Sequence, residues 1–358
     1  MPQADIHFEV VGSAGKILLD RPKALNALSH DMIRAFTSQL KKWRYDPAIT
    51  HVVIASSAPR AFCAGGDIRF AREVILAGQY AKADQFFRDE YLGDLAVAEF
   101  GKPVIALADG VVMGGGAGLA CHATHVVVTE NTLFAMPESS IGLFPDAGAS
   151  LFFGRCPRPV ARLLGMIGHV INGADCLLLG LASAMVPSYD IVALQEALLR
   201  VDASGVDAST FDALISEYSA DSGAPSLAAH RPRIHHIFAD GLSPEAIRDR
   251  AVDLAQLYPD DKFVGAVAAA LSERCPMSIK VFCRMMDVAR DFTQPAEALA
   301  LEFQLAMRMI RRDDFVEGIR AVVVDKDQSP KWQPDRLEAI DAAMLEAVFD
   351  GAGLPPLR

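Results

Sequence analysis

Residues 51–67, HVVIASSAPRAFCAGGD, join an apolar run to a glycine-rich loop, and this combination decides the fold class. The run HVVIAS is rich in β-branched residues, which is typical of a strand covered on both faces. The arrangement returns at VIALAD (104–109), which precedes MGGGAGLA (113–120) and a helical pattern. Near the start of the chain, the short apolar runs FEVVG and KILLD precede the helical pattern DMIRAFTSQLKKW. The sequence therefore predicts an α/β fold of repeated strand, strand and helix units.

The strand signals stop near residue 190. Beyond it, apolar residues recur at helical spacing in five segments, and Ser243 with Pro244 forms a typical helix start. Residues 202–226 are rich in small and acidic side chains, so we expect a surface connection there. We predict two regions, a catalytic core at 1–190 and a helical C-terminal region at 191–358.

Charge and hydropathy exclude several kinds of partner. Lys and Arg total 34 against 45 Asp and Glu, so the net charge of -11 argues against binding a nucleic-acid backbone. No segment reaches the roughly 18 consecutive apolar residues that span a bilayer. The first residues lack the basic and apolar pattern of a secretory leader. We expect a cytoplasmic protein that binds neither nucleic acid nor membrane, and the sequence leaves a homo-oligomer open.

The cysteine pattern argues against a metal centre. Six cysteines are scattered without a CxxC pair, which favours reduced, mostly buried thiols over a zinc ribbon or a disulfide framework. Cys121, His122 and His125 lie close together, but their spacing supplies no fourth ligand, so we interpret them as core and turn residues. No metal and no redox cofactor is expected.

Two glycine-rich loops, Ala64–Gly66 and Gly114–Gly116, each follow a predicted buried strand. Glycine lets a ligand approach the main chain closely, so two backbone amides from these loops could hold an oxyanion. A dinucleotide-binding fold is the alternative, and Glu130 does end the next strand. However, MGGGAGLA lacks the third small residue at the spacing of that fingerprint. Tight packing of helix on strand would also account for some of these glycines.

A pair of carboxylates, Glu138 and Asp146, follows in a segment too rich in Ser, Gly and Pro to form one long helix. Their neighbours Phe134, Met136, Ile141, Leu143 and Phe144 are apolar. A carboxyl group in such surroundings has the raised pKa that suits a general acid or base. We therefore expect both carboxylates to face one cleft.

Four segments carry a family resemblance: AFCAGGDI (61–68), MGGGAGLA, FAMPESSIGLFPDAGAS (134–150) and GIRAVVVDKDQSPKW (318–332). Together they resemble the enoyl-CoA hydratase/isomerase (crotonase) superfamily. Within it, MPE, GLFPD and DKDQSPKW are similar to the branch that hydrolyses 3-hydroxyacyl-CoA thioesters. The resemblance spans nearly the whole chain, and it implies a crotonase-type spiral of β-β-α units with a helical C-terminal region.

The resemblance also implies roles for individual residues. The amides of Ala64 and Gly115 would form the oxyanion hole for the thioester carbonyl, and the segment containing Arg21, Lys23, Ala24 and Leu25 would bind coenzyme A. Substrate contacts would come from Gly66, Asp67, Glu90 and Phe144, although Asp67 could instead only cap the next helix.

Departures from the hydratase pattern indicate the reaction. Hydratases usually carry a carboxylate two residues after the glycines, where this chain has Gly118. Glu138 is retained, and Asp146 stands where hydratases usually have glycine. The resemblance thus implies hydrolysis of 3-hydroxyisobutyryl-CoA, with 3-hydroxypropionyl-CoA as the second candidate. Glu138 would act as general base or as nucleophile, while Asp146 and Glu90 would orient water and the 3-hydroxyl. A hydratase or isomerase and a non-catalytic acyl-CoA-binding module stay open.

Overall fold

The computed structural model describes residues 5–201, 207–221 and 223–358, and the chain forms two compact units. The first unit contains Met1–Asp67, Asp89–Phe134 and Ile171–Ser226. The second contains Ile68–Arg88, Ala135–Val170 and Leu227–Arg358. Both units are discontinuous in sequence.

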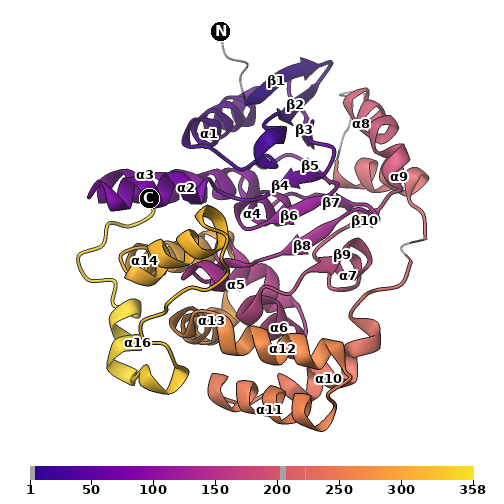
Figure 1. The fold of residues 1–358 in the computed structure, drawn as a ribbon. Coiled ribbons are helices and arrows are strands. Elements are labelled where there is room, and N and C mark those ends of the chain that lie inside the picture. The colour runs from indigo at the N-terminus through magenta and orange to yellow at the C-terminus, as the bar shows by residue number, and fades with distance from the viewer. Residues whose placement is uncertain (1–4, 202–206, 222) are drawn as a thin grey trace. The chain divides into compact units, whose positions relative to one another are not determined.

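Figure 1 labels the strands and the α-helices, with the exception of α15. The strands are β1 Ile6–Val11, β2 Ala14–Leu19, β3 His51–Ser56, β4 Ala61–Cys63, β5 Val104–Ala108, β6 Val111–Met113, β7 His125–Val128, β8 Leu133–Ala135, β9 Ile171–Asn172 and β10 Ala184–Met185. The α-helices are α1 His30–Tyr45, α2 Ile68–Leu76, α3 Tyr80–Ala98, α4 Gly115–Cys121, α5 Ala149–Phe152, α6 Arg158–Ile167, α7 Gly173–Leu178, α8 Ile191–Leu199, α9 Ala208–Tyr218, α10 Arg231–Ile237, α11 Pro244–Leu257, α12 Lys262–Glu273, α13 Pro276–Val288, α14 Pro295–Met309, α15 Asp313–Ile319 and α16 Ala342–Phe349.

The first unit is built on a six-stranded sheet with the order β1-β2-β3-β5-β7-β10. β1 and β2 pair antiparallel, and the pairs from β2 to β10 are parallel. A smaller sheet has the order β4-β6-β8-β9. β3 is mostly apolar, β5 is wholly apolar, and both are almost wholly buried, as is typical of strands covered on both faces.

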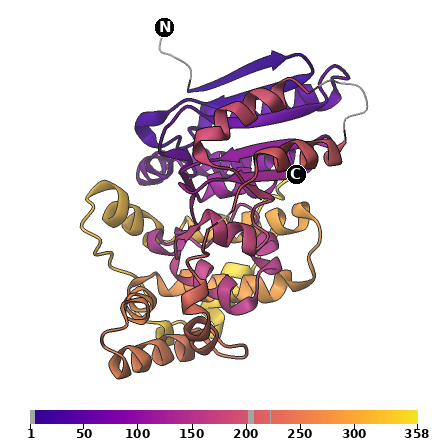
Figure 2. The same cartoon turned by 90° about the vertical axis from the view of Figure 1, so that its right-hand side faces the viewer.

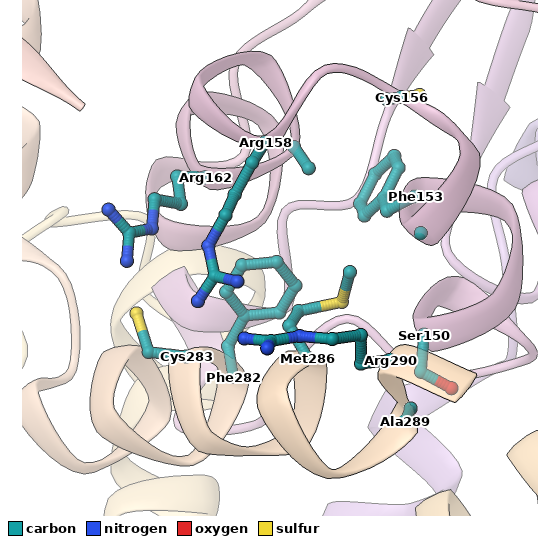
Figure 3. A pocket seen from close by; sticks show the side chains of 12 residues that line it. Ser150, Phe153, Cys156, Arg158, Arg162, Phe282, Cys283, Met286, Ala289 and Arg290 are labelled. Atoms are coloured by element: carbon teal, nitrogen blue, oxygen red, sulfur yellow. The ribbon is translucent and has the colours of Figure 1, made fainter. Parts of the chain in front are cut away.

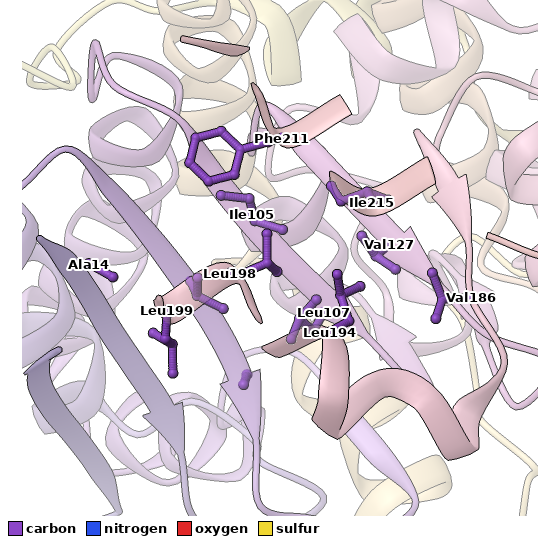
Figure 4. Packing of buried hydrophobic residues seen from close by; sticks show 12 residues of the cluster. Ala14, Ile105, Leu107, Val127, Val186, Leu194, Leu198, Leu199, Phe211 and Ile215 are labelled. Carbon is purple, nitrogen blue, oxygen red and sulfur yellow. The ribbon is translucent and has the colours of Figure 1, made fainter. Parts of the chain in front are cut away.

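Helices α8 and α9 cover one face of the six-stranded sheet (Figure 2). Leu194, Leu198 and Phe211 are fully buried in a cluster with Val53, Ile105, Val127 and other strand residues (Figure 4). The apolar face of α9 contradicts the surface connection expected at 202–226, since Phe211 and Ile215 pack into this core. Residues 202–206 and 222 of that stretch lie outside the described residues.

The second unit is helical, and within it α6 packs against α13. Gly165 lies on α6 where the ring of Phe282 from α13 fills the space that a side chain would need. A Cβ atom at residue 165 would lie 2.0 Å from Phe282 Cζ, and Phe282 is fully buried. A residue without a side chain therefore lets these two helices approach closely.

Replacing Gly165 with alanine should destabilise the protein by about 1–3 kcal/mol, because a buried core has no room for an added methyl group. Gly265 is the matched control, since it also lies within a helix but its Cβ position meets nothing within 4 Å. Gly265→Ala should be neutral or stabilise by about 0.5–1 kcal/mol. Urea unfolding of both variants measures this, and equal stability of the two would contradict the packing argument.

The described residues beyond Met185 contain helices and no strand, which confirms that the strand signals stop near residue 190. Among the described residues, no helix combines the length and the apolar character needed to cross a bilayer.

Candidate functional site

The first glycine loop follows β4 and pairs with the segment that precedes α1. The Leu28 amide donates a hydrogen bond to the Gly65 carbonyl oxygen (2.8 Å), and the Asp67 amide donates one to the Leu28 carbonyl oxygen (2.9 Å). Leu28 and Gly66 thus form a parallel bridge. In such a bridge the amide and carbonyl groups of Gly66 itself point away from the segment that contains Leu28. The Gly66 amide is therefore directed away from Leu28.

The second glycine loop places the backbone amide of Gly115 close to that of Gly66. Gly114, with φ of +53°, precedes α4, and the Gly115 amide in the first turn has no carbonyl partner within its own helix. A Cβ atom at Gly115 would lie 3.4 Å from the nitrogen of Gly66, and one at Gly65 would lie 3.2 Å from the nitrogen of Gly115. The backbone amides of Gly66 and Gly115 are therefore neighbours.

The Ala64 amide has a different role from the one expected. It donates a 3.0 Å hydrogen bond to the Leu25 carbonyl oxygen, so the fold already uses this donor. Gly65, which lies between Ala64 and Gly66, has φ of +99°, so the regular alternation of an extended chain is broken there. The Gly66 amide is therefore directed away from the segment that binds the Ala64 amide. The structure thus corrects the expected pair, since it brings Gly66 to Gly115 and engages Ala64 elsewhere.

Glu90 on α3 lies directly against the second glycine loop. A Cβ atom at Gly115 would lie 2.1 Å from Glu90 Oε1, so the carboxylate occupies the space beside this glycine. Glu90 is 7 % exposed, and Asp94, one helical turn later, is 1 % exposed. Asp94 was not predicted, although its spacing of four residues from Glu90, which puts both carboxylates on one face of the helix, was an available signal.

Cys63 shares this neighbourhood and is unsuited to act as a nucleophile. Burial raises the pKa of its thiol to about 12, and the negative charges of Glu90 and Asp94 act in the same direction. The thiol therefore stays protonated at neutral pH, while the reactive form of cysteine is the thiolate.

The segment expected to bind coenzyme A is held in place by side chains of the first unit. Arg21 donates hydrogen bonds to Asp67 Oδ2 (2.8 Å) and to the Ala27 carbonyl oxygen (2.9 Å). Asp67 therefore pairs with Arg21. Buried Asn26 donates to the Phe62 carbonyl oxygen (3.0 Å) and accepts from the Arg21 amide (2.8 Å). Lys23 is exposed, and Ala24 and Leu25 are half-buried.

The remaining predicted residues lie in the second unit. Glu138 begins a short 3-10 helix, Glu138–Ile141, which ends at Gly142 in the left-handed conformation. Asp146 lies in the loop before α5. Both carboxylates are only 6 % exposed, and Phe144 between them is fully buried. The expected absence of one long helix across this segment is confirmed, and both acidic groups are buried.

A family model for enoyl-CoA hydratase/isomerase matches residues 14–349. The chain belongs to this family. Relatives in the enoyl-CoA hydratase/isomerase family include a protein from Homo sapiens named 3-hydroxyisobutyryl-CoA hydrolase, mitochondrial. It is 36 % identical over 357 residues, which cover 99 % of this chain and 90 % of that protein.

A plant relative and a solved structure agree with this assignment. An Arabidopsis thaliana protein named 3-hydroxyisobutyryl-CoA hydrolase 1 is 33 % identical, covering 99 % of this chain and 95 % of that protein. A structure described as an enoyl-CoA hydratase from Rhodobacter sphaeroides 2.4.1 is 32 % identical, with a TM-score of 0.89 and coverage of 99 % and 100 %. The expected crotonase-type α/β fold is confirmed.

The family motif DKDQSPKW forms a cluster of charges around Arg320. The guanidinium group pairs with Glu317 (2.8 Å), Asp325 (2.8 Å) and Asp327 (2.5 Å). The Lys331 amide donates to Glu317 Oε1 (2.9 Å), and the Trp332 indole donates to the Glu273 carbonyl oxygen (2.7 Å). These contacts tie the segment to α15 and α12, which is a structural use of the motif.

A cavity of about 220 Å³ in the second unit contains none of the predicted site residues. Phe153, Phe282 and Met286 supply apolar walls (Figure 3). Two of its arginines, Arg158 and Arg290, both pair with Asp287, so their charges are largely satisfied within the fold. We assign this cavity no ligand.

The sequence cluster of Cys121, His122 and His125 is not arranged as a metal site. Buried His125 contacts Thr124 Oγ1 (2.9 Å) and Asp212 Oδ1 (3.2 Å), and its ring lies 6.0 Å from that of Phe211. Over the described parts of the chain, no group of three or more His, Cys, Asp or Glu side chains could hold a metal ion. His125 is a core residue, as expected.

Proposed function

We propose that this protein hydrolyses 3-hydroxyisobutyryl-CoA to 3-hydroxyisobutyrate and free coenzyme A. The observation that carries the proposal is the nearly full-length identity of 33–36 % with relatives whose names state this activity. The residue types support hydrolysis over hydration. Gly118 is buried on α4, where a hydratase would need its second carboxylate, while Asp146 adds a carboxylate after Glu138.

We assign the oxyanion hole to the amides of Gly66 and Gly115. These two donors would stabilise the negative charge that develops on the thioester oxygen, and one such donor typically contributes about 3 kcal/mol to lowering the barrier. Glu138 either takes a proton from the attacking water or attacks the carbonyl itself to form an anhydride. In the first route the water oxygen adds to the carbonyl carbon, and the tetrahedral intermediate collapses as the coenzyme A thiolate leaves. In the second route the thiolate leaves as the anhydride forms, and a water molecule then hydrolyses the anhydride, which releases 3-hydroxyisobutyrate and regenerates Glu138. Asp146 and Glu90 orient water and the 3-hydroxyl of the substrate.

A thiol-release assay over a small panel of acyl-CoA substrates tests the proposal. We expect release from 3-hydroxyisobutyryl-CoA and, second, from 3-hydroxypropionyl-CoA. Hydration of crotonyl-CoA with an intact hydroxyacyl thioester would instead identify a hydratase. Binding of the thioester without any release of thiol would identify a non-catalytic module.

We expect activity to survive exhaustive dialysis against a chelator and to need no added nicotinamide cofactor. The reaction as proposed uses only amide donors and carboxylates, and a thioester carbonyl polarised in this way needs no Lewis acid. Turnover before and after dialysis measures this. Loss of activity that zinc restores would contradict the proposal that neither metal nor redox cofactor takes part.

The proposed physiological setting is valine breakdown in the cytoplasm, with the acyl-CoA as the small-molecule partner. The location stays a prediction, because the human relative is named as a mitochondrial protein. Fractionation of the native cell with an antibody to this chain tests it.

A further inference from the structure

A fully buried carboxylate on α14, Glu302, binds the turn that follows Asp146. Its Oε2 atom accepts a hydrogen bond from the Gly148 amide (2.6 Å), and its Oε1 atom accepts one from the Ser150 amide (2.8 Å). Both oxygens of one side chain therefore hold a turn that is more than 150 residues away in sequence.

The same turn, which begins at Asp146, has an unfavourable backbone conformation at the next residue, Ala147. The Ala149 amide, between the two that Glu302 binds, donates to the Asp146 carbonyl oxygen (2.9 Å). Ala147 has φ of +54° and Gly148 has φ of +92°. A left-handed conformation is unfavourable for alanine, so the surrounding structure must hold it. The contacts of Glu302 on the next residues supply such a restraint.

The ionisation of Glu302 links it to Asp146 as well. Burial raises the pKa of Glu302 to about 8, hydrogen bonds from Ser150 and Gly148 oppose this shift, and the charge of Asp146 adds to it. The two carboxyl groups are thus close enough to interact. Burying a carboxyl group is unfavourable unless its oxygens are satisfied, and here the amides of the turn satisfy them.

We propose that Glu302 is a positioning residue that fixes Asp146 for recognition of the substrate's 3-hydroxyl. Glu302 acts through the turn at residues 146–150 and not on the reacting atoms. The proposal rests on the proposed function, in which Asp146 contacts that hydroxyl.

The test compares Glu302→Gln with the native protein on 3-hydroxyisobutyryl-CoA and on isobutyryl-CoA. Glutamine keeps the shape of the side chain, but its amide nitrogen would face a backbone N–H, so one of the two hydrogen bonds is lost. Misplacement by about 1 Å can cost a hundredfold in rate. We expect kcat/KM for the hydroxylated substrate to fall about 10- to 100-fold, with a much smaller change for isobutyryl-CoA. Glu302→Asp, which retains two acceptor oxygens, should give an intermediate ratio and serves if the glutamine variant does not fold.

Asp175→Asn is the matched control for a merely structural effect. Asp175 is a fully buried carboxylate of the first unit that accepts hydrogen bonds from the amides of Asn172 (3.3 Å) and Ser226 (3.0 Å). The Asp175→Asn variant should lower the melting temperature as Glu302→Gln does, yet leave unchanged the ratio of the kcat/KM values for the two substrates.

The double variant tests whether Glu302 acts through Asp146. In an Asp146→Ala background, Glu302→Gln should cause no further decrease in the ratio of the two kcat/KM values, because the residue that Glu302 positions is already gone.

The outcomes separate the two proposals. If the native protein releases no thiol from 3-hydroxyisobutyryl-CoA, the proposed function fails, and if it cleaves both thioesters equally, recognition of the 3-hydroxyl and with it the positioning role fail before any variant is measured. If the native protein discriminates and Glu302→Gln keeps the full ratio, or reduces it equally with and without Asp146, the positioning role is overturned and the proposed function stands.

Discussion

Glu138→Gln is expected to lower the turnover of 3-hydroxyisobutyryl-CoA at least about a hundredfold, since general acid or base groups typically contribute 10² to 10⁴. The substitution keeps the size of the side chain and its hydrogen-bonding capacity, but it removes both the basicity and the nucleophilicity of the carboxylate. Binding of coenzyme A should barely change, because Glu138 is assigned to the acyl group. Steady-state kinetics and a binding titration with coenzyme A measure the two effects.

Glu273→Gln is the matched control for this prediction. It makes the same chemical change at an exposed position of α12 in the same unit. Its turnover should equal that of the native protein. Near-normal turnover of a correctly folded Glu138→Gln variant would remove Glu138 from the mechanism.

Isobutyryl-CoA, which lacks only the 3-hydroxyl, should be cleaved at least about a hundredfold less efficiently than 3-hydroxyisobutyryl-CoA. Asp146 is 6 % exposed and must find partners. If the substrate hydroxyl is one of them, the deoxy analogue leaves part of the carboxylate unpaired. Sites built to bind a hydroxyl can reject such analogues by about 10⁴, whereas a missing methylene costs about 10 to 200. The ratio of the two kcat/KM values measures this effect.

Asp146→Ala should shrink that ratio, because the carboxylate that penalises the deoxy substrate is gone. The variant should also cleave the hydroxylated substrate more slowly than the native protein does. Asp253→Ala, at an exposed position of α11, should change neither value. Equal cleavage of both thioesters by the native protein would exclude hydroxyl recognition and indicate a general acyl-CoA thioesterase.

Local patterns predicted much of the fold because they encode which face of each element is buried. The β-branched run at His51–Ser56 forms a buried parallel strand, and Ser243 caps α11 through a hydrogen bond from the Ala246 amide (3.2 Å). Helical spacing also predicted the region after Met185. The expectation failed at α9, where buried Phe211 and Ile215 shared a segment with many small and acidic residues. That prediction relied on the composition of the segment and did not use the spacing of Phe211 and Ile215, which are one helical turn apart.

By itself the sequence determined the α/β class and the family, since these follow from periodicity and from motifs of neighbouring residues. Only the tertiary structure decided toward which group each backbone amide of the first glycine loop is directed. Ala64 and Gly66 are two residues apart, yet the first donates to Leu25 and the second lies beside Gly115. Tertiary structure also joined Glu302 to Gly148 and Arg21 to Asp67. A hydrogen-bond partner depends on where the folded chain places distant segments, and spacing along the sequence carries no record of that placement.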